Sequence, residues 1–133
     1  MGLNVLIIED TDSIRKMIEA LMSARGHKVT GASNGARGLE CALEETPDLV
    51  LLDLNLPGAF DGIEVCRRLR AEEATSHVPI LIISAMNDDD TRARVLDAGA
   101  TAFYSKPFSP MSLLKEIDSI KIRLSSSPKL PTT

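Results

Sequence analysis

Five polar side chains suited to phosphoryl transfer stand at the ends of short apolar runs. Glu9 and Asp10 follow the first such run, and Asp53, Ser84 and Lys106 follow three others. Carboxylates that lie close together repel one another, and a hard divalent cation such as Mg²⁺, which prefers oxygen ligands, removes that conflict. Beside a metal ion a lone ammonium group suits a phosphoryl oxygen, and the central carboxylate, Asp53, can attack phosphorus and become an aspartyl phosphate. These residue types predict acceptance of a phosphoryl group if the fold brings them together.

The apolar runs before these residues are continuous, not alternating. Continuous runs are typical of strands that are buried on both faces of a parallel sheet. Three runs are clear and two are weaker. The clear ones are Leu3–Ile8, Leu49–Leu52 and Val78–Ile83, and the weaker ones are His27–Ala32 and Thr101–Ser105.

Between the runs, apolar residues recur at helical spacing, which predicts five helices with one buried stripe each. Asp61, the acidic run Asp88–Asp90 and Ser109 are placed to cap three of these helices, and Pro110 suits a first helical position. The stripes are Ile14-Met17-Ile18-Leu21-Met22, Leu39-Ala42-Leu43, Ile63-Cys66-Leu69, Ala93-Leu96-Ala98 and Leu113-Leu114-Ile117-Ile120-Lys121-Leu124.

Strand and helix therefore alternate five times, which predicts an α/β fold of the (βα)5 type. Parallel strands need crossover connections, so a doubly wound, five-stranded parallel sheet of order 2-1-3-4-5 fits best. In such sheets, sites form outside the carboxyl ends of the strands where the order reverses, here between strands 1 and 3. Glu9, Asp10 and Asp53 should meet there, with Ser84 and Lys106 next along the same edge.

Length and composition favour one small acidic domain. The chain has 133 residues, with 15 Lys and Arg against 19 Asp and Glu, a formal net charge of −4 and only 3% aromatic residues. These values argue against direct nucleic-acid binding by this chain, which needs a basic face or stacking rings. The sequence has no run of 18 apolar residues that could span a membrane, and it shows no signal peptide. A cytoplasmic protein is therefore expected.

The domain is expected to cover residues 1–124, with residues 125–133 as a flexible tail or the start of a linker, because that stretch is rich in Ser and Pro. Cys41 and Cys66 are expected to be small buried hydrophobes, and His27 and His77 to occupy unremarkable surface or strand-end positions.

Four segments together resemble the receiver domains of two-component response regulators: Glu9-Asp10, Leu52-Asp53-Leu54-Asn55-Leu56-Pro57, Ser84-Ala85 and Lys106-Pro107-Phe108. The resemblance runs from about Leu3 to Leu124 and implies a flavodoxin-like, or CheY-like, fold. It implies that a sensor histidine kinase or a histidine phosphotransfer protein phosphorylates the chain, and that a downstream effector or output domain receives the signal. Such a domain is a phosphoacceptor, not an enzyme with a separate substrate, and catalyses only its own phosphoryl transfer and dephosphorylation.

The same resemblance assigns roles at the sheet edge. Asp53 corresponds to the phosphoacceptor, and Glu9, Asp10, Asp53 and the backbone carbonyl of Asn55 correspond to the ligands of Mg²⁺, for which Mn²⁺ can substitute. Lys106 corresponds to the lysine that pairs with the phosphoryl group, and the Lys106-Pro107 linkage is cis in that family.

The switch residues implied by the resemblance are Ser84 and Phe103. The Ser84 hydroxyl is expected to move to the phosphoryl oxygen, and Phe103 to fill the space it leaves, which changes the face formed by helix 4, strand 5 and helix 5. Tyr104 does not match the position of the switch aromatic residue in that family, which Phe103 fills. Phe103 has no hydroxyl, so packing must set its preference.

Alternatives from other classes are a haloacid-dehalogenase-like phosphatase, a flavodoxin-type electron carrier and a degenerate receiver used only for docking. The phosphatase needs a second Asp two residues after its nucleophile, where this chain has Asn55. A flavin phosphate would be repelled by Glu9-Asp10, and the filled hallmark positions argue against degeneracy. Ile14 fits both a core position and an apolar docking surface.

Overall fold

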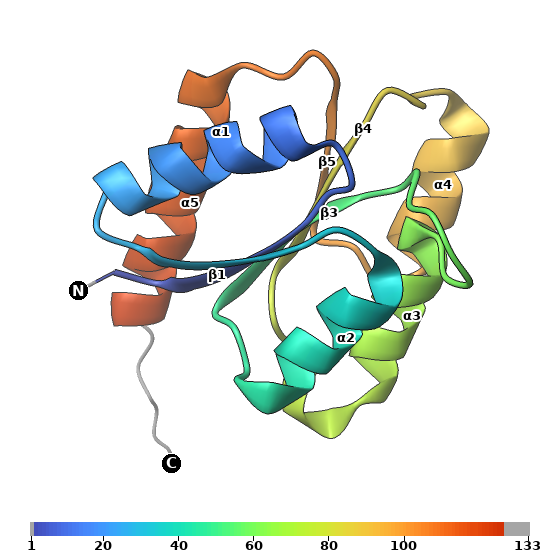
Figure 1. The fold of residues 1–133 in the computed structure, drawn as a ribbon, viewed down its shortest axis with the longest axis horizontal. Coiled ribbons are helices and arrows are strands. Elements are labelled where there is room, and N and C mark those ends of the chain that lie inside the picture. The colour runs from blue at the N-terminus through green and yellow to red at the C-terminus, as the bar shows by residue number, and fades with distance from the viewer. Residues whose placement is uncertain (1, 127–133) are drawn as a thin grey trace.

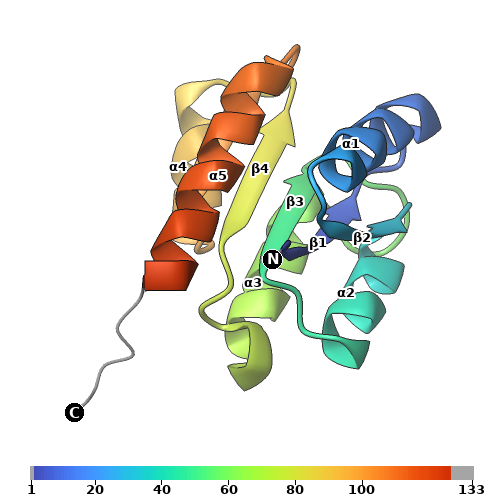
Figure 2. The ribbon, with the colours of Figure 1, turned by 90° about the vertical axis from the view of Figure 1, so that its left-hand side faces the viewer.

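The computed structural model describes residues 2–126, which form one five-stranded parallel sheet flanked by helices (Figure 1). The strand order is β2-β1-β3-β4-β5, as the sequence predicts. Figure 2 shows β3 and β4 with their arrowheads at the same end of the sheet. The strands are β1 (Asn4–Ile8), β2 (Lys28–Ala32), β3 (Leu49–Asp53), β4 (Ile80–Ser84) and β5 (Ala102–Ser105). The helices are α1 (Asp12–Ala24), α2 (Gly35–Glu44), α3 (Gly62–Ala71), α4 (Asp89–Asp97) and α5 (Pro110–Ser126), with a 3₁₀ turn at Glu73–Thr75.

Helices cover both faces of the sheet, which explains why β1, β3 and β4 consist mostly of apolar residues. All five residues of β3 and all five of β4 are buried. One core joins the sheet to α2, α3 and α4, and contains Cys41, Val65, Leu69 and Val95. A second core joins the other face to α1 and α5, and contains Ile18, Met22, Leu113 and Ile117. The fold thus follows from strands that bury apolar surface on both sides.

The buried helix faces are narrower than the predicted stripes. Met17 is 42% exposed, Leu43 54% and Leu96 57%, so their assignment to buried stripes was wrong. Helical spacing places a residue on one side of its helix, but it does not say how far the neighbouring sheet extends. In α4 the buried side chains are Thr91 and Val95.

Ile14 is half-buried and packs against the core of α1 and α5, which favours the core interpretation of this residue. Both cysteines are free and buried, as predicted, and His77 is exposed. His27 corrects the expectation of an unremarkable position. It is only 6% exposed, and its Nδ1 accepts a hydrogen bond from the Leu3 N–H at 3.0 Å.

The predicted caps are present. Asp61 Oδ1 accepts from the Glu64 N–H (2.9 Å), Asp88 Oδ2 from the Thr91 N–H (3.1 Å), and Ser109 Oγ from the Ser112 N–H (3.3 Å).

Helix α5 continues to Ser126, so it includes two residues that the sequence assigns to the tail, and residues 127–133 lie outside the described part of the chain. None of the described helices is long and apolar enough to cross a membrane.

Arg70, near the end of α3, makes hydrogen bonds at the amino edge of the sheet. Arg70 donates to four backbone carbonyl oxygens, those of Thr75, Ser76, Val78 and Gly99, at 2.6 to 3.3 Å. These residues precede β4 and β5, so the arginine ties α3 to the starts of both strands.

Candidate functional site

The strand register brings the polar residues of the sequence analysis to one edge of the sheet. Ile8 of β1 pairs with Leu52 of β3, so Glu9, one residue further on, comes level with Asp53. The Glu9 N–H continues the ladder to the Ala32 carbonyl oxygen of β2 (3.0 Å). Since β1 and β3 are neighbours in the middle of the sheet, this point is where the strand order reverses.

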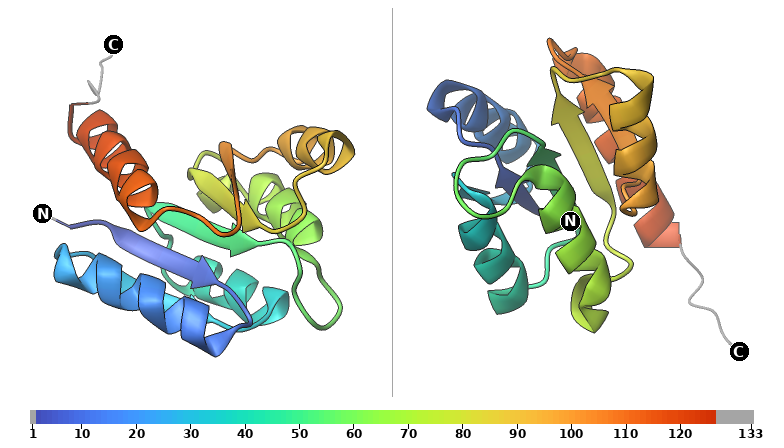
Figure 3. Two further views of the ribbon diagram at one scale, coloured as in Figure 1. Left: turned by 90° about the horizontal axis from the view of Figure 1, so that it is seen from above. Right: turned by 90° about the vertical axis from the view of Figure 1, so that its right-hand side faces the viewer.

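Ser84 and Lys106 reach the same edge from the other side of β3. Ser84 ends β4 and pairs with Ser105 of β5, and the Lys106 N–H donates to the Ser84 carbonyl oxygen at 2.8 Å. The two views of Figure 3 show the connection between β3 and α3, in green, projecting beyond the strand ends beside this edge.

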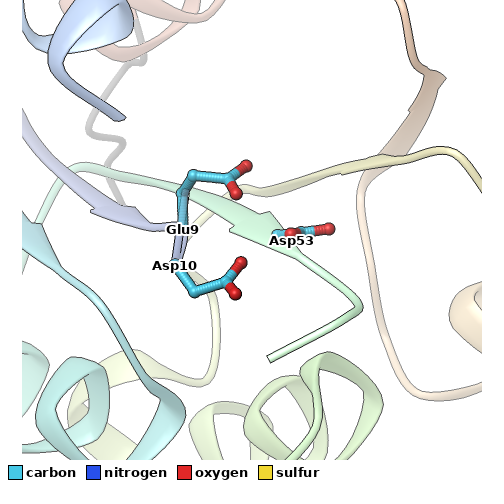
Figure 4. Close-up of side chains that lie close together, drawn as sticks. All are labelled: Glu9, Asp10 and Asp53. Atoms are coloured by element: carbon cyan, nitrogen blue, oxygen red, sulfur yellow. The ribbon is translucent and has the colours of Figure 1, made fainter. Parts of the chain in front are cut away.

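Three carboxylates gather here (Figure 4). Glu9, Asp10 and Asp53 each offer one oxygen, and these oxygens all lie within 4.8 Å of one another. Glu9 is 3% exposed and Asp53 5%, whereas Asp10 is exposed. Two of the three charges are therefore shielded from water, and the third faces the solvent.

The Lys106 ammonium group lies close to both buried carboxylates. Lys106 Nζ is 3.1 Å from Glu9 Oε1 and 3.5 Å from Asp53 Oδ2. Burial, together with the charge of Glu9, outweighs the attraction of Lys106 and raises the pKa of Asp53 from 3.8 to about 6. Burial alone lowers the pKa of Lys106, but its hydrogen bond to Glu9 and the charge of Asp53 raise that pKa overall.

The donor set fits a hard divalent cation. Asp53 is costly to ionise where it stands, because it is buried beside the charge of Glu9 and the one nearby lysine is shared with that carboxylate. Mg²⁺ prefers carboxylate oxygens and keeps several waters, and the exposed Asp10 leaves the cluster open to solvent on one side. The cluster of Glu9, Asp10 and Asp53 could therefore hold a metal ion of this kind.

The start of α3 approaches the end of β3 closely. A Cβ atom at Gly62 would overlap the Asp53 carbonyl oxygen and crowd the Leu54 Cα at 2.6 Å, so only glycine fits here. The Asn55 N–H donates to Asp53 Oδ1 at 3.3 Å and orients the carboxylate. The Lys106–Pro107 peptide bond is cis.

Ser84 and Phe103 are engaged elsewhere. The Ser84 side chain is fully buried, and its Oγ accepts from the Met86 N–H at 3.1 Å. Phe103 packs against the core of α2, α3 and α4, and the Arg92 guanidinium lies 4.6 Å from the centre of its ring. Tyr104 packs against the opposite core. Lys106 thus contacts the carboxylates directly, whereas Ser84 on β4 and Phe103 on β5 make their contacts elsewhere.

Two contacts around Glu9 were not anticipated from the sequence. The Thr11 N–H donates to Glu9 Oε2 (3.1 Å), and Arg15 Nη1 donates to the Glu9 carbonyl oxygen (2.8 Å). The sequence offered little signal for these contacts: Arg15 comes five residues after Asp10, and a backbone carbonyl leaves no mark in a sequence.

Comparison with known proteins gives consistent matches. Residues 5–118 match the model of the response regulator receiver domain family. The chain is 42% identical over 104 residues to the transcriptional regulatory protein AfsQ1 of Streptomyces coelicolor, covering 78% of this chain and 44% of that protein. The chain thus spans less than half the length of that curated relative.

Two solved structures are similar over nearly the whole fold. The receiver domain of the sensor histidine kinase PA1611 from Pseudomonas aeruginosa, solved with a magnesium ion in its active-site cleft, is 30% identical, with a TM-score of 0.83 over 91% of this chain and 99% of that one. Chemotaxis protein CheY4 of Vibrio cholerae is 28% identical, with a TM-score of 0.84 over 90% of this chain and 99% of that one.

Proposed function

Because this chain belongs to the response regulator receiver domain family of two-component signalling, we propose that it is a switch that is phosphorylated on Asp53. The observation that carries the proposal is the position of Asp53, which is buried, has a raised pKa and lies beside Glu9, Asp10 and Lys106. A sensor histidine kinase or a histidine phosphotransfer protein is the proposed donor. A downstream effector or output domain is the proposed receiver of the signal.

Glu9, Asp10 and Asp53, with the Asn55 backbone carbonyl, are the proposed ligands of Mg²⁺, or of Mn²⁺ in its place. A magnesium ion lies in the active-site cleft of the similar PA1611 receiver domain, which supports this assignment. When bound, the ion neutralises charge that builds up on the transferring phosphoryl group.

The transfer step uses a carboxylate oxygen of Asp53 as nucleophile. A bond forms between this oxygen and phosphorus, while the phosphorus–nitrogen bond of the donor phosphohistidine breaks and leaves its electron pair on the imidazole, which takes up a proton. Lys106 Nζ, 3.5 Å from Asp53 Oδ2, is placed to pair with the added negative charge.

Signal output follows from the rearrangement of Ser84 and Phe103. In the structure, Ser84 Oγ accepts a hydrogen bond from the N–H of Met86, which lies on the segment that leads into α4. Attraction of the hydroxyl to a phosphoryl oxygen would release this bond and allow Phe103 to move toward the vacated space. The face formed by α4, β5 and α5 would then change, which is a local charge event acting on a two-state element.

The test is phosphorylation of the full chain by acetyl phosphate with Mg²⁺, read by intact-protein mass spectrometry. The wild type should gain one phosphoryl group, and Asp53→Asn should gain none. Asp89→Asn, which changes an exposed aspartate in the first turn of α4, is the matched control and should be labelled like the wild type. Equal labelling of the wild type and Asp53→Asn would refute the assignment, and sustained release of phosphate from an ester would favour a phosphatase.

A further inference from the structure

Arg15 contacts the chain just after β1, where Glu9 and Asp10 follow the strand. Its Nη1 donates to the Glu9 carbonyl oxygen at 2.8 Å, and its Nη2 to Asp12 Oδ1 at 2.6 Å. The Arg15 side chain is only 15% exposed, although it belongs to the first turns of a surface helix. The guanidinium group therefore bridges the end of the strand and the start of α1.

This contact occurs where the chain must leave the strand conformation. Side chains of consecutive strand residues point to opposite faces of a sheet, yet Glu9 and Asp10 offer oxygens to the same cluster. The chain therefore turns between these two residues, just beyond β1. The Glu9 N–H is still in the ladder with Ala32, whereas the Glu9 carbonyl accepts from Arg15 instead of from a neighbouring strand.

The arginine is itself held from the other side. Arg15 Nε lies 3.8 Å from Glu19 Oε2, and both side chains run over Gly31 of β2. A Cβ atom at position 31 would overlap Glu19 Oε2 and crowd Arg15 Cδ at 3.1 Å. The absence of a side chain at Gly31 thus leaves the space through which Arg15 reaches the Glu9 carbonyl.

We propose that Arg15 is a positioning residue for the metal site, which fixes the Glu9 carbonyl and with it the turn that directs Glu9 and Asp10 toward Asp53. The inference rests on the proposed metal site and adds a residue to it. Groups that orient metal ligands without touching the metal are a general requirement of such sites.

The charge of Arg15 allows a sharp test, because charge and position predict opposite results. Removing a cation from the neighbourhood of a cation site should by itself tighten metal binding. Removing a group that orients two ligands should weaken it, by about tenfold at the lower end of the effects seen for such groups. Asp12 and Glu19 already oppose the Arg15 charge, so its electrostatic effect on the site should be small.

The experiment is a titration of the full chain with Mg²⁺ by isothermal calorimetry, without a phosphodonor. Arg15→Ala should weaken Mg²⁺ binding about tenfold. Lys16→Ala is the matched control, since Lys16 is an exposed cation next in the same helix, and it should leave the affinity unchanged or slightly tighter. Affinity in Arg15→Ala equal to or tighter than in the wild type would overturn the inference.

A second variant protects the test against misfolding of Arg15→Ala. Gly31→Ala keeps every charge, and its Cβ would overlap Glu19 Oε2 and crowd Arg15 Cδ, so it should weaken Mg²⁺ binding in the same direction but by less than Arg15→Ala does. Unchanged affinity in Gly31→Ala, with a folded protein by circular dichroism, would count against the inference. A wild type that binds no Mg²⁺ would instead refute the proposed function, so the two failures are distinct.

Discussion

The two edges of the sheet bury charge in opposite ways. At the carboxyl edge, Glu9 and Asp53 are buried side by side and share one lysine, and the pKa of Asp53 is raised to about 6. At the amino edge, Arg70 donates hydrogen bonds to four backbone carbonyl oxygens. A buried charge whose hydrogen bonds are satisfied rigidifies the segments around it. Two like charges that share one counter-charge instead leave a site that a bound cation would stabilise.

This difference assigns stability to one edge and chemistry to the other. Substitutions at the amino edge should change the free energy of unfolding with little effect on the site. Substitutions at the carboxyl edge should change both, and some of them should stabilise the protein while abolishing its chemistry.

Arg70→Ala should have the largest effect on stability, a loss of about 3 kcal/mol, because it leaves several carbonyl groups at the starts of β4 and β5 without their donor. Urea unfolding followed by circular dichroism measures this loss. Arg67→Ala is the matched control: Arg67 is on the same helix, but its side chain is 54% exposed and its contact with Glu64 is 4.0 Å long, so it should cost less than about 0.5 kcal/mol. Folded Arg70→Ala should be labelled by acetyl phosphate like the wild type. Loss of labelling would contradict the claim that the amino edge serves stability and the carboxyl edge serves chemistry.

Lys106→Met should cost about 2 kcal/mol at pH 7.5, because it leaves Glu9 and Asp53 buried without their shared cation. The loss should shrink below pH about 6, where the Asp53 carboxyl takes up a proton and the repulsion disappears. Urea unfolding at pH 7.5 and pH 5.5 tests this. A loss that is the same at both pH values would mean that packing of the lysine stem, not its charge, is what matters.

His27→Leu should cost about 1 kcal/mol at pH 7.5, because the Leu3 N–H loses its acceptor. Burial and the nearby Lys121 and Arg25 lower the pKa of His27, against the opposing effect of Asp118. Folding therefore favours the neutral form, whose contribution is fully present above pH about 6.5 and is lost as the pH falls below that value toward the lower pKa of the folded state. The gap between the wild type and His27→Leu should narrow on acidification, and a gap that widens would contradict this.

The sequence predicted much of this arrangement because its signals are local. Continuous apolar runs identify the buried strands, strand–helix alternation gives the order of the sheet, and parallel strands put Glu9, Asp53 and Lys106 at one edge. The burial of His27 and the contacts of Arg15 and Arg70 were missed for one reason. Their partners are backbone groups, which every residue carries and no sequence pattern marks.

Helix faces show the limit of periodicity in another way. Leu96 has the spacing of a buried residue and is 57% exposed, while the neighbouring Val95 is 1% exposed. Spacing fixes the angle between residues around a helix axis, but the rotation of the helix against the sheet depends on the whole core. Val95 of α4 and Ala98, the residue that follows this helix, belong to that core.

The central claim, that the carboxyl edge is destabilised by charge until a cation binds, is tested most directly by the free energy of unfolding of the wild type and Asp53→Asn at pH 7.5, with and without Mg²⁺. A raised pKa means that the ionised Asp53 opposes folding above pH about 6. Asp53→Asn should therefore be more stable than the wild type by about 2 kcal/mol without Mg²⁺. Saturating Mg²⁺ should stabilise the wild type more and narrow the difference. Equal stability of the two proteins without Mg²⁺, or an equal gain from Mg²⁺ in both, would contradict the account.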